Sequence, residues 1–179
     1  MSETPGFRPV ARALIVMGVS GCGKTTLAKA LSDRLGFEMI EGDSLHPPEN
    51  VEKMRAGVPL DDSDRAPWLD RIGELLQARG VEGRSVVVTC SALKRAYRDR
   101  LRAARPDLVF VFLEGSRDLI AARVGARRHE YMPASLLDSQ FATLERPASG
   151  EPAVIVDAAL DPQAQVQAAL ELLAKGAWT

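Results

Sequence analysis

The sequence is poor in several features, and each shortage excludes a class of protein. Cysteine occurs only twice in 179 residues, which is too few for a disulfide framework and suits a reducing compartment. No stretch approaches the roughly 18 apolar residues that a membrane-spanning helix needs. The formal net charge is only −1, so no overall positive field indicates nucleic acid or an anionic membrane as a partner. These shortages favour a cytoplasmic protein.

The chain has the length and composition of one globular domain. Apolar residues make up 46% of it and charged residues 26%, the balance of a soluble, folded protein. Residues 1–11 contain an acid, two prolines and no apolar core segment, so they are not expected to act as a signal peptide. We predict a single domain over residues 1–179 that begins with a flexible tail.

Short apolar runs alternate with segments of helical spacing. Runs rich in Val, Ile and Phe that do not alternate with polar residues are typical of strands buried on both faces. Alternating strands and helices favour a parallel sheet with helices on both faces. The predicted strands are 13–19, 85–90, 108–114 and 153–158, with a weaker one at 37–42, and the predicted helices are 24–35, 68–79, 94–104, 116–127, 134–144 and 162–174.

The strongest motif is GVSGCGKT at residues 18–25, which fits G-x-x-x-x-G-K-[ST] between a predicted strand and a predicted helix. Glycines let consecutive backbone N–H groups point at phosphate oxygens, and the helix adds its positive N-terminal end. Lys24 can reach the β- and γ-phosphates of ATP, and the Thr25 hydroxyl can ligate Mg²⁺. The predicted ATP-binding residues are Gly18, Val19, Ser20, Gly21, Cys22, Gly23, Lys24, Thr25 and Thr26.

Other nucleotide-binding classes fit poorly. A GTPase would need an N-K-x-D guanine-binding motif, which is absent, and its D-x-x-G motif is matched only inside a predicted helix, at 70–73. A motor or transport ATPase would normally be larger and would carry an acidic residue at the end of an apolar strand, where this chain has Cys90 and Ser91. The remaining class is a small-molecule kinase with an acceptor pocket and a mobile lid.

A polar segment, EGDSLHPPENVEKM at residues 41–54, follows the second predicted strand. Asp43 comes at the edge where open α/β sheets bind ligands, and its carboxylate can accept the proton of an attacking hydroxyl or reach Mg²⁺ through water. His46 and Lys53 are candidate contacts of the acceptor molecule. The alternatives are a helix-capping Asp, a solvated His and a surface Lys. The other polar side chains of this segment are predicted to face solvent: Glu49, Asn50 and Glu52.

Two basic groups complete the candidate site. Lys94 and Arg98 are four residues apart and share a helix face, which we predict to meet an acidic substrate at the carboxyl edge of the sheet. Arg123 and Arg127 lie at the end of a helix and in the loop after it. Arginines in a closing lid can stabilise the transferring phosphoryl group, although basic residues also stabilise a helix C-terminus.

Four blocks, in this order, resemble the gluconokinase family: GVSGCGKTT, EGDSLHPPENVEKMRAGVPLDDSDRAPWL, CSALKRAYRDRLR and LLDSQFATLERP. The resemblance implies a three-layer α/β P-loop kinase fold with a five-stranded parallel sheet, an acceptor-binding helical segment near 44–80 and a mobile lid near 123–135. It also implies phosphorylation of D-gluconate by ATP with Mg²⁺, and a homodimer. The residues implied are Lys24, Asp43, Arg123 and Arg127 for catalysis and Asp43, His46, Lys53 and Arg98 for gluconate.

Two alternatives remain open from the sequence. A shikimate kinase has a similar size and an anionic, hydroxylated substrate, but it should show a Gly-Gly-Gly turn after the third strand, where this chain reads Cys90-Ser91-Ala92. A non-catalytic nucleotide-binding module would keep the loop without the chemistry. The intact Lys24, Thr25 and Asp43 favour an enzyme.

Overall fold

Strands and helices alternate along the chain, as the apolar runs predict. The structure is a computed structural model and describes residues 12–126, 134–176 and 178–179. Five strands form one sheet in the order β2-β3-β1-β4-β5, and all neighbouring strands are parallel. The prediction of a five-stranded parallel sheet is confirmed. The strands are β1 Ala13–Met17, β2 Glu38–Glu41, β3 Val86–Thr89, β4 Leu108–Glu114 and β5 Ala153–Asp157.

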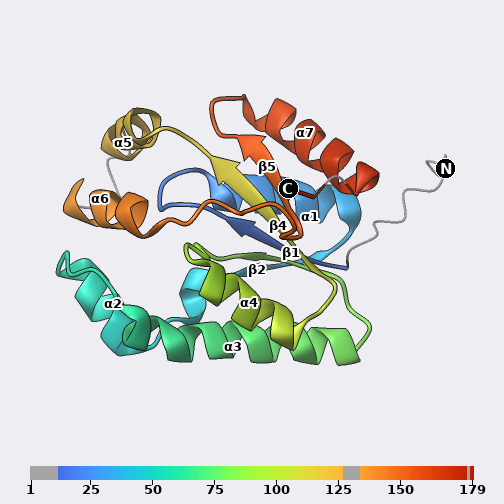
Figure 1. Cartoon of the computed structure of the whole chain (residues 1–179), viewed down its shortest axis with the longest axis horizontal. Coiled ribbons are helices and arrows are strands. Elements are labelled where there is room, and N and C mark those ends of the chain that lie inside the picture. The colour runs from blue at the N-terminus through green and yellow to red at the C-terminus, as the bar shows by residue number, and fades with distance from the viewer. Residues whose placement is uncertain (1–11, 127–133, 177) are drawn as a thin grey trace.

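Helices cover both faces of the sheet (Figure 1). Alternate residues of β1 belong to different cores: Leu14 and Val16 pack on the side of α1 and α7, whereas Ile15 and Met17 pack on the side of α3. Both faces of the strand are therefore buried, which explains its unbroken apolar sequence. The helices are α1 Lys24–Leu35, η1 Gly42–Leu45 (a 3-10 helix), α2 Pro48–Arg55, α3 Asp62–Val81, α4 Arg95–Ala104, α5 Arg117–Ala126, α6 Ala134–Thr143 and α7 Pro162–Lys175.

Helix α3 begins earlier than predicted. The sequence places a helix over 68–79, but α3 starts at Asp62 and contains Pro67 within it. A capping box explains the early start: the Asp61 side chain accepts from the Asp64 amide at 2.8 Å, and the Asp64 side chain accepts from the Asp61 amide at 3.0 Å. Pro67 is the sixth residue of α3, beyond the first turn, and it removes one backbone hydrogen-bond donor from the helix.

The topology places the candidate site at one edge of the sheet. The central strand β1 has β3 on one side and β4 on the other, and the connections diverge from it in opposite directions. Ligands bind in the crevice outside the carboxyl ends of the strands at such a switch point. The predicted tail (1–11) and most of the predicted lid, including Arg127, lie outside the described residues.

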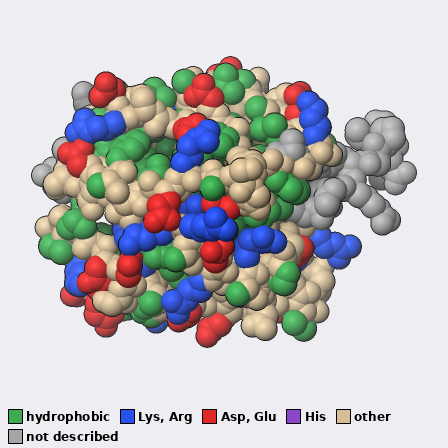
Figure 2. Space-filling model, in the orientation of Figure 1, with side chains coloured by type: hydrophobic (Ala, Val, Ile, Leu, Met, Phe, Trp, Pro, Cys, Tyr) green, Lys and Arg blue, Asp and Glu red, His purple; other side chains and the backbone are tan. Residues whose placement is uncertain are grey.

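The surface carries mixed charge. Figure 2 shows acidic and basic side chains interspersed over the face seen in Figure 1, in agreement with the net charge of −1. Over the described residues, no helix combines the length and apolar character needed to cross a membrane.

Candidate active site

The loop between β1 and α1 has the geometry of a phosphate cradle. Gly21 adopts a φ of 81°, and a Cβ placed there would lie 2.4 Å from Cγ2 of Val124 in α5, so only glycine fits. Gly23 caps α1 with a φ of 106° and no side-chain cap. Within the described chain, the amides of Gly21, Gly23, Lys24 and Thr25 donate to no protein group. These free donors at a helix N-terminus form an anion site.

Lys24 lies folded along the same loop. Its Nζ donates to the carbonyl oxygens of Gly18 at 3.2 Å and Val19 at 3.1 Å. These are neutral acceptors, so the ammonium charge has no carboxylate partner in the described residues. A phosphate oxygen at the loop would supply one.

A cavity of ≈ 430 Å³ extends from this loop across the carboxyl edge of the sheet. It brings together residues that are far apart in the sequence, and its wall combines the phosphate-binding loop with the end of β2, the start of α3 and helix α6. The lining residues are Ser20, Gly21, Gly23, Lys24, Thr25, Thr26, Glu41, Asp43, His46, Val51, Met54, Arg55, Pro59, Leu60, Arg65, Trp68, Thr89, Ser91, Leu136, Ser139 and Gln140.

Two carboxylates lie on the cavity wall, one at the end of β2 and one just after it. Asp43 is exposed in η1 and lines the cavity together with Lys24. Oε2 of Glu41 accepts a hydrogen bond of 2.6 Å from the Thr89 hydroxyl, whereas its Oε1 is buried and has no partner in the described structure. A buried carboxylate oxygen without a partner is costly, so this atom fits a site that a ligand or its water shell completes. The sequence prediction overlooked Glu41.

His46 lies on the wall as predicted, and it stacks on Trp68 with a centroid distance of 4.1 Å. The Trp68 indole N–H donates to the Gly42 carbonyl at 2.8 Å, which holds the aromatic pair against η1. Burial lowers the pKa of His46; Asp43 opposes the shift and Arg65 adds to it. The ring is therefore favoured in its neutral form.

Arg65 is a site residue for which the sequence analysis predicted no role. It is only 8% exposed and lines the cavity. Its Nη1 hydrogen-bonds the Tyr97 hydroxyl at 3.3 Å, and its guanidinium lies 5.7 Å from the centre of the Tyr97 ring. No carboxylate of the described chain forms an ion pair with it. The sequence did offer one indication of such a role: Arg65 lies between the acids at 61–64 and the Pro-Trp pair in the second family block.

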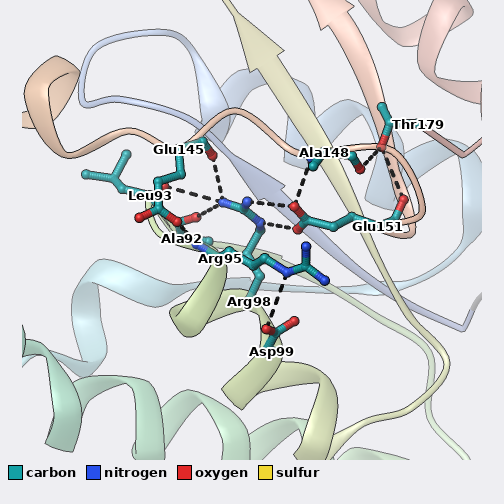
Figure 3. Close-up of polar contacts among 9 residues, drawn as sticks. All are labelled: Ala92, Leu93, Arg95, Arg98, Asp99, Glu145, Ala148, Glu151 and Thr179. Carbon is teal, nitrogen blue, oxygen red and sulfur yellow. Dashed lines mark hydrogen bonds and ion pairs between the residues drawn. The ribbon is translucent and has the colours of Figure 1, made fainter.

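The prediction that Arg98 contacts the acceptor is wrong. Its side chain is 1% exposed and pairs with Glu151 at 2.6 and 3.0 Å (Figure 3). Nη1 donates to the carbonyls of Ala92 and Glu145, both at 3.0 Å. The guanidinium is thus saturated inside the protein. Burial alone would raise the pKa of Glu151, but the hydrogen bonds from Arg98 and from the Ala148 amide outweigh it and lower that pKa.

Lys53 is also directed away from the cavity wall. Its Nζ forms an ion pair of 2.6 Å with Asp64, and this hydrogen bond raises the pKa of Lys53. Lys53 does not line the cavity, although its neighbours Val51, Met54 and Arg55 do. The pair joins α2 to the start of α3 instead.

Arg123 lies behind the phosphate-binding loop. Its two terminal nitrogens donate to the carbonyl oxygens of Cys22 at 3.4 Å and Ala158 at 2.6 Å. It does not line the cavity in this state. The position ties α5 and the end of β5 to the loop.

Gln140 in α6 makes a reciprocal contact with the same loop. Its Oε1 accepts from the Ser20 amide at 2.7 Å, and its Nε2 donates to the Ser20 hydroxyl at 2.8 Å. Both residues line the cavity. The contact spans 120 positions of sequence, so no local pattern predicts it.

The comparisons with known proteins agree with this geometry. A family model described as an AAA domain matches residues 14–147. The gluconokinase of Gluconobacter oxydans is 50% identical over 157 residues, covering 88% of this chain and 87% of that protein. The chain belongs to the gluconokinase family. A probable gluconokinase of Schizosaccharomyces pombe is 46% identical over 159 residues, covering 84% of this chain and 81% of that protein.

Solved structures support the same family. A gluconokinase from Sinorhizobium meliloti superposes with a TM-score of 0.87 at 48% identity, and the match covers 94% of each chain. A shikimate kinase from Aquifex aeolicus superposes with a TM-score of 0.61 at 19% identity, covering 92% of this chain and 98% of that one. The second likeness is one of fold alone.

Proposed function

We propose that this chain transfers the γ-phosphoryl group of ATP to the 6-hydroxyl of D-gluconate, giving ADP and 6-phospho-D-gluconate. The observation that carries the proposal is a cavity that joins the phosphate-binding loop to the carboxylate of Asp43 and the buried guanidinium of Arg65. Its relatives named as gluconokinases support the choice of substrate.

The loop and Lys24 are assigned to the triphosphate. The free amides of Gly21, Gly23, Lys24 and Thr25 surround the space that phosphate oxygens would occupy. Lys24 exchanges its two carbonyl acceptors for β- and γ-phosphate oxygens, which are charged and therefore stronger acceptors. Phosphoryl transfer depends mainly on such positioning and charge stabilisation.

The residues present fit Mg²⁺ as the partner of ATP. Thr25 offers a hydroxyl beside the phosphates, and Glu41 offers a buried oxygen without a protein partner. Oxygen ligands and retained waters are what Mg²⁺ prefers. Thr25 would hold the ion directly and Glu41 would accept from its water shell, while the ion neutralises charge on the phosphates.

Asp43 is assigned as the proton acceptor. As the 6-hydroxyl oxygen of gluconate forms its bond to the γ-phosphorus, the bond from that phosphorus to the β-bridging oxygen breaks and ADP leaves. The hydroxyl proton passes to the Asp43 carboxylate, which shares the cavity with Lys24.

Arg65 is assigned to the substrate carboxylate. An acid sugar needs a cation at the end remote from the reacting hydroxyl. Of the cations on the acceptor side, Arg98 is saturated by Glu151 and Lys53 is paired with Asp64, and Arg55 lines the cavity with an exposed side chain. Arg65 is buried, faces the cavity and lacks a carboxylate partner in the described chain, and a planar guanidinium binds a carboxylate with two hydrogen bonds.

A coupled ADP-release assay across gluconate, shikimate and several nucleoside monophosphates tests the proposal. Strong turnover with gluconate and little with the others is the expected result. Activity with a nucleoside monophosphate only would overturn it, and turnover confined to shikimate would favour the related kinase class.

We also propose a homodimer and a cytoplasmic location, both of which rest on the family resemblance and on the composition of the chain. Size-exclusion chromatography with light scattering tests the first. A mass of one 19.4 kDa chain at working concentration would contradict it.

A further inference from the structure

Asn50 is the only asparagine in the chain. The sequence predicts that it faces solvent, but it is buried. Its side chain is 3% exposed in α2. Nδ2 lies 2.8 Å from the backbone carbonyl oxygen of Asp64 and 3.2 Å from Nδ1 of His46. One buried amide thus connects the acceptor-side histidine to the first turn of α3.

The chemistry of these contacts fixes where the protons lie. A backbone carbonyl only accepts hydrogen bonds, so the Asn50 atom facing it is the NH₂ group. The second proton of that group points at His46, and Nδ1 must therefore carry a lone pair. In a neutral imidazole whose Nδ1 accepts, the proton resides on Nε2.

The surroundings of His46 support this protonation state. Stacking on Trp68 fixes the plane of the ring, and Nδ1 is directed at α2, so Nε2 is the nitrogen left for the cavity that His46 lines. Burial and the positive charge of Arg65 disfavour the imidazolium, although Asp43 favours it. Lys53 and Asp64 also lie near this contact, and their opposite charges neutralise each other.

We propose that Asn50 is a positioning residue that holds His46 in its Nε2–H form, so that His46 donates a hydrogen bond to a hydroxyl oxygen of the acceptor and does not take its proton. This inference rests on the proposed function for the identity of the acceptor. It leaves Asp43 as the base of the site. It also gives α2 a role in substrate recognition that Lys53 does not supply.

The protonation state is measurable without any substrate. The chain has two histidines, and loss of one set of signals in a His46→Gln variant assigns His46 in ¹⁵N spectra of the histidine rings. At neutral pH the wild-type protein should show an unprotonated Nδ1 and a protonated Nε2. A protonated Nδ1, in either the neutral or the cationic ring, would overturn the inference.

Variants of Asn50 connect this state to catalysis. In Asn50→Asp the new carboxylate accepts from the ring, so Nδ1 should become protonated; in Asn50→Leu the preference should be lost. Both should lower kcat/KM for gluconate roughly 3- to 10-fold, the value of one net hydrogen bond, while KM for ATP stays the same. Glu49→Gln, an exposed change on the same helix, is the matched control and should alter neither the spectrum nor the rates.

The outcomes separate this inference from the proposed function. Reduced gluconate turnover in Asn50→Asp with an unchanged Nδ1 signal would mean that Asn50 only braces α2 against α3, and the inference would fail. If the ring is in the Nε2–H form but the protein does not phosphorylate gluconate, the proposed function is wrong, and so is the role of His46 in recognising gluconate. The effect of Asn50 on the tautomer would still stand. Thermal melts of each variant identify any loss that comes from unfolding.

Discussion

Arg65 and Arg98 are both buried, yet only Arg98 has a carboxylate partner in the described chain. A buried charge without a partner destabilises the folded state, and Arg65 is tolerated because it borders a cavity that water and an anionic ligand can enter. Replacing the two arginines should therefore have different effects. Loss of Arg65 should impair binding, and loss of Arg98 should impair folding.

Arg65→Met should raise KM for gluconate about 10- to 100-fold, because hydrogen bonds between charged groups contribute about 1.5–3 kcal/mol. KM for ATP should be unchanged, and the penalty should vanish for a polyol acceptor that lacks a carboxylate. Steady-state kinetics with both acceptors measure this. Lys53→Met is the matched control and should leave KM for gluconate within about twofold, since its charge serves a surface pair. A larger effect at Lys53 than at Arg65 would reverse the assignment.

Asp43→Asn should lower kcat by a factor of about 10² or more while ATP still binds, because general-base catalysis contributes roughly that much. The amide keeps the size of the side chain and removes its ability to take a proton. Rapid-quench measurement of the chemical step, with ATP affinity measured by titration, separates the two effects. Turnover close to that of the wild type would show that another group receives the proton.

Helix α6 is held to the rest of the molecule by contacts near its C-terminal end. Gln140 pairs with Ser20 of the phosphate-binding loop, and the carbonyl of Glu145, just beyond the helix, accepts from Arg98. The Arg98–Glu151 pair therefore fixes the segment that carries Gln140 into the cavity. The arginine for which a substrate role was predicted thus contacts the segment that follows α6, not the cavity.

Gln140→Ala should raise KM for ATP roughly 5- to 150-fold, since it removes two hydrogen bonds that hold the loop and each contributes about 0.5–1.5 kcal/mol. KM for gluconate should change less. A Ser20→Ala/Gln140→Ala double mutant should be less impaired than the sum of the single variants, because the two side chains act on each other. Additive effects in that cycle would show that Gln140 acts independently of Ser20.

Glu151→Gln should destabilise the fold by about 3–5 kcal/mol at neutral pH, the cost of leaving the buried Arg98 without its partner. The folded-state pKa of Glu151 lies below its ordinary value of 4.5. The stability that ionised Glu151 contributes is therefore fully present above pH 4.5, its ordinary pKa. It is lost as the pH falls through the lower pKa of the folded state. Urea unfolding at pH 7 and near pH 4 should show the gap between variant and wild type narrowing in acid. As the control, Glu49→Gln should change the free energy of unfolding by no more than about 0.5 kcal/mol. A stability difference between Glu151→Gln and wild type that stays constant with pH would contradict the role of the Glu151 charge.

The strand ends at the candidate site all belong to one parallel sheet. A ligand bound there contacts several parts of the fold at once and should therefore stabilise the whole domain. A ligand that binds only the folded chain adds about 2.7 kcal/mol at 100 times its Kd. ATP with Mg²⁺ and gluconate should each raise the unfolding midpoint in differential scanning fluorimetry. In Arg65→Met the shift with gluconate should fall and the shift with ATP should persist. Loss of both shifts would indicate a damaged fold rather than a lost contact.

Much of the fold could be predicted from short stretches of sequence. The phosphate-binding loop could be predicted because it is contiguous: eight neighbouring residues specify the turn, the free amides and the lysine. The strands are recognised by unbroken apolar runs such as ALIVM, which only a sheet covered on both faces can bury. The prediction missed the early start of α3, since Pro67 hid a capping box six residues before it.

The sequence alone therefore determined the fold class, the ATP loop and the place of Asp43 beyond the second strand. Only the tertiary structure shows which of the cations are paired inside the protein. Arg65, Arg98 and Lys53 are all basic residues within the family blocks, and a one-dimensional pattern cannot state where their counter-charges lie. Glu151 lies 53 positions from Arg98 and Asp64 lies 11 from Lys53, and folding brings both acids within hydrogen-bond distance. Because a paired cation is neutralised, we assign the proposed role in binding to Arg65, the buried arginine that faces the cavity without a carboxylate partner in the described chain.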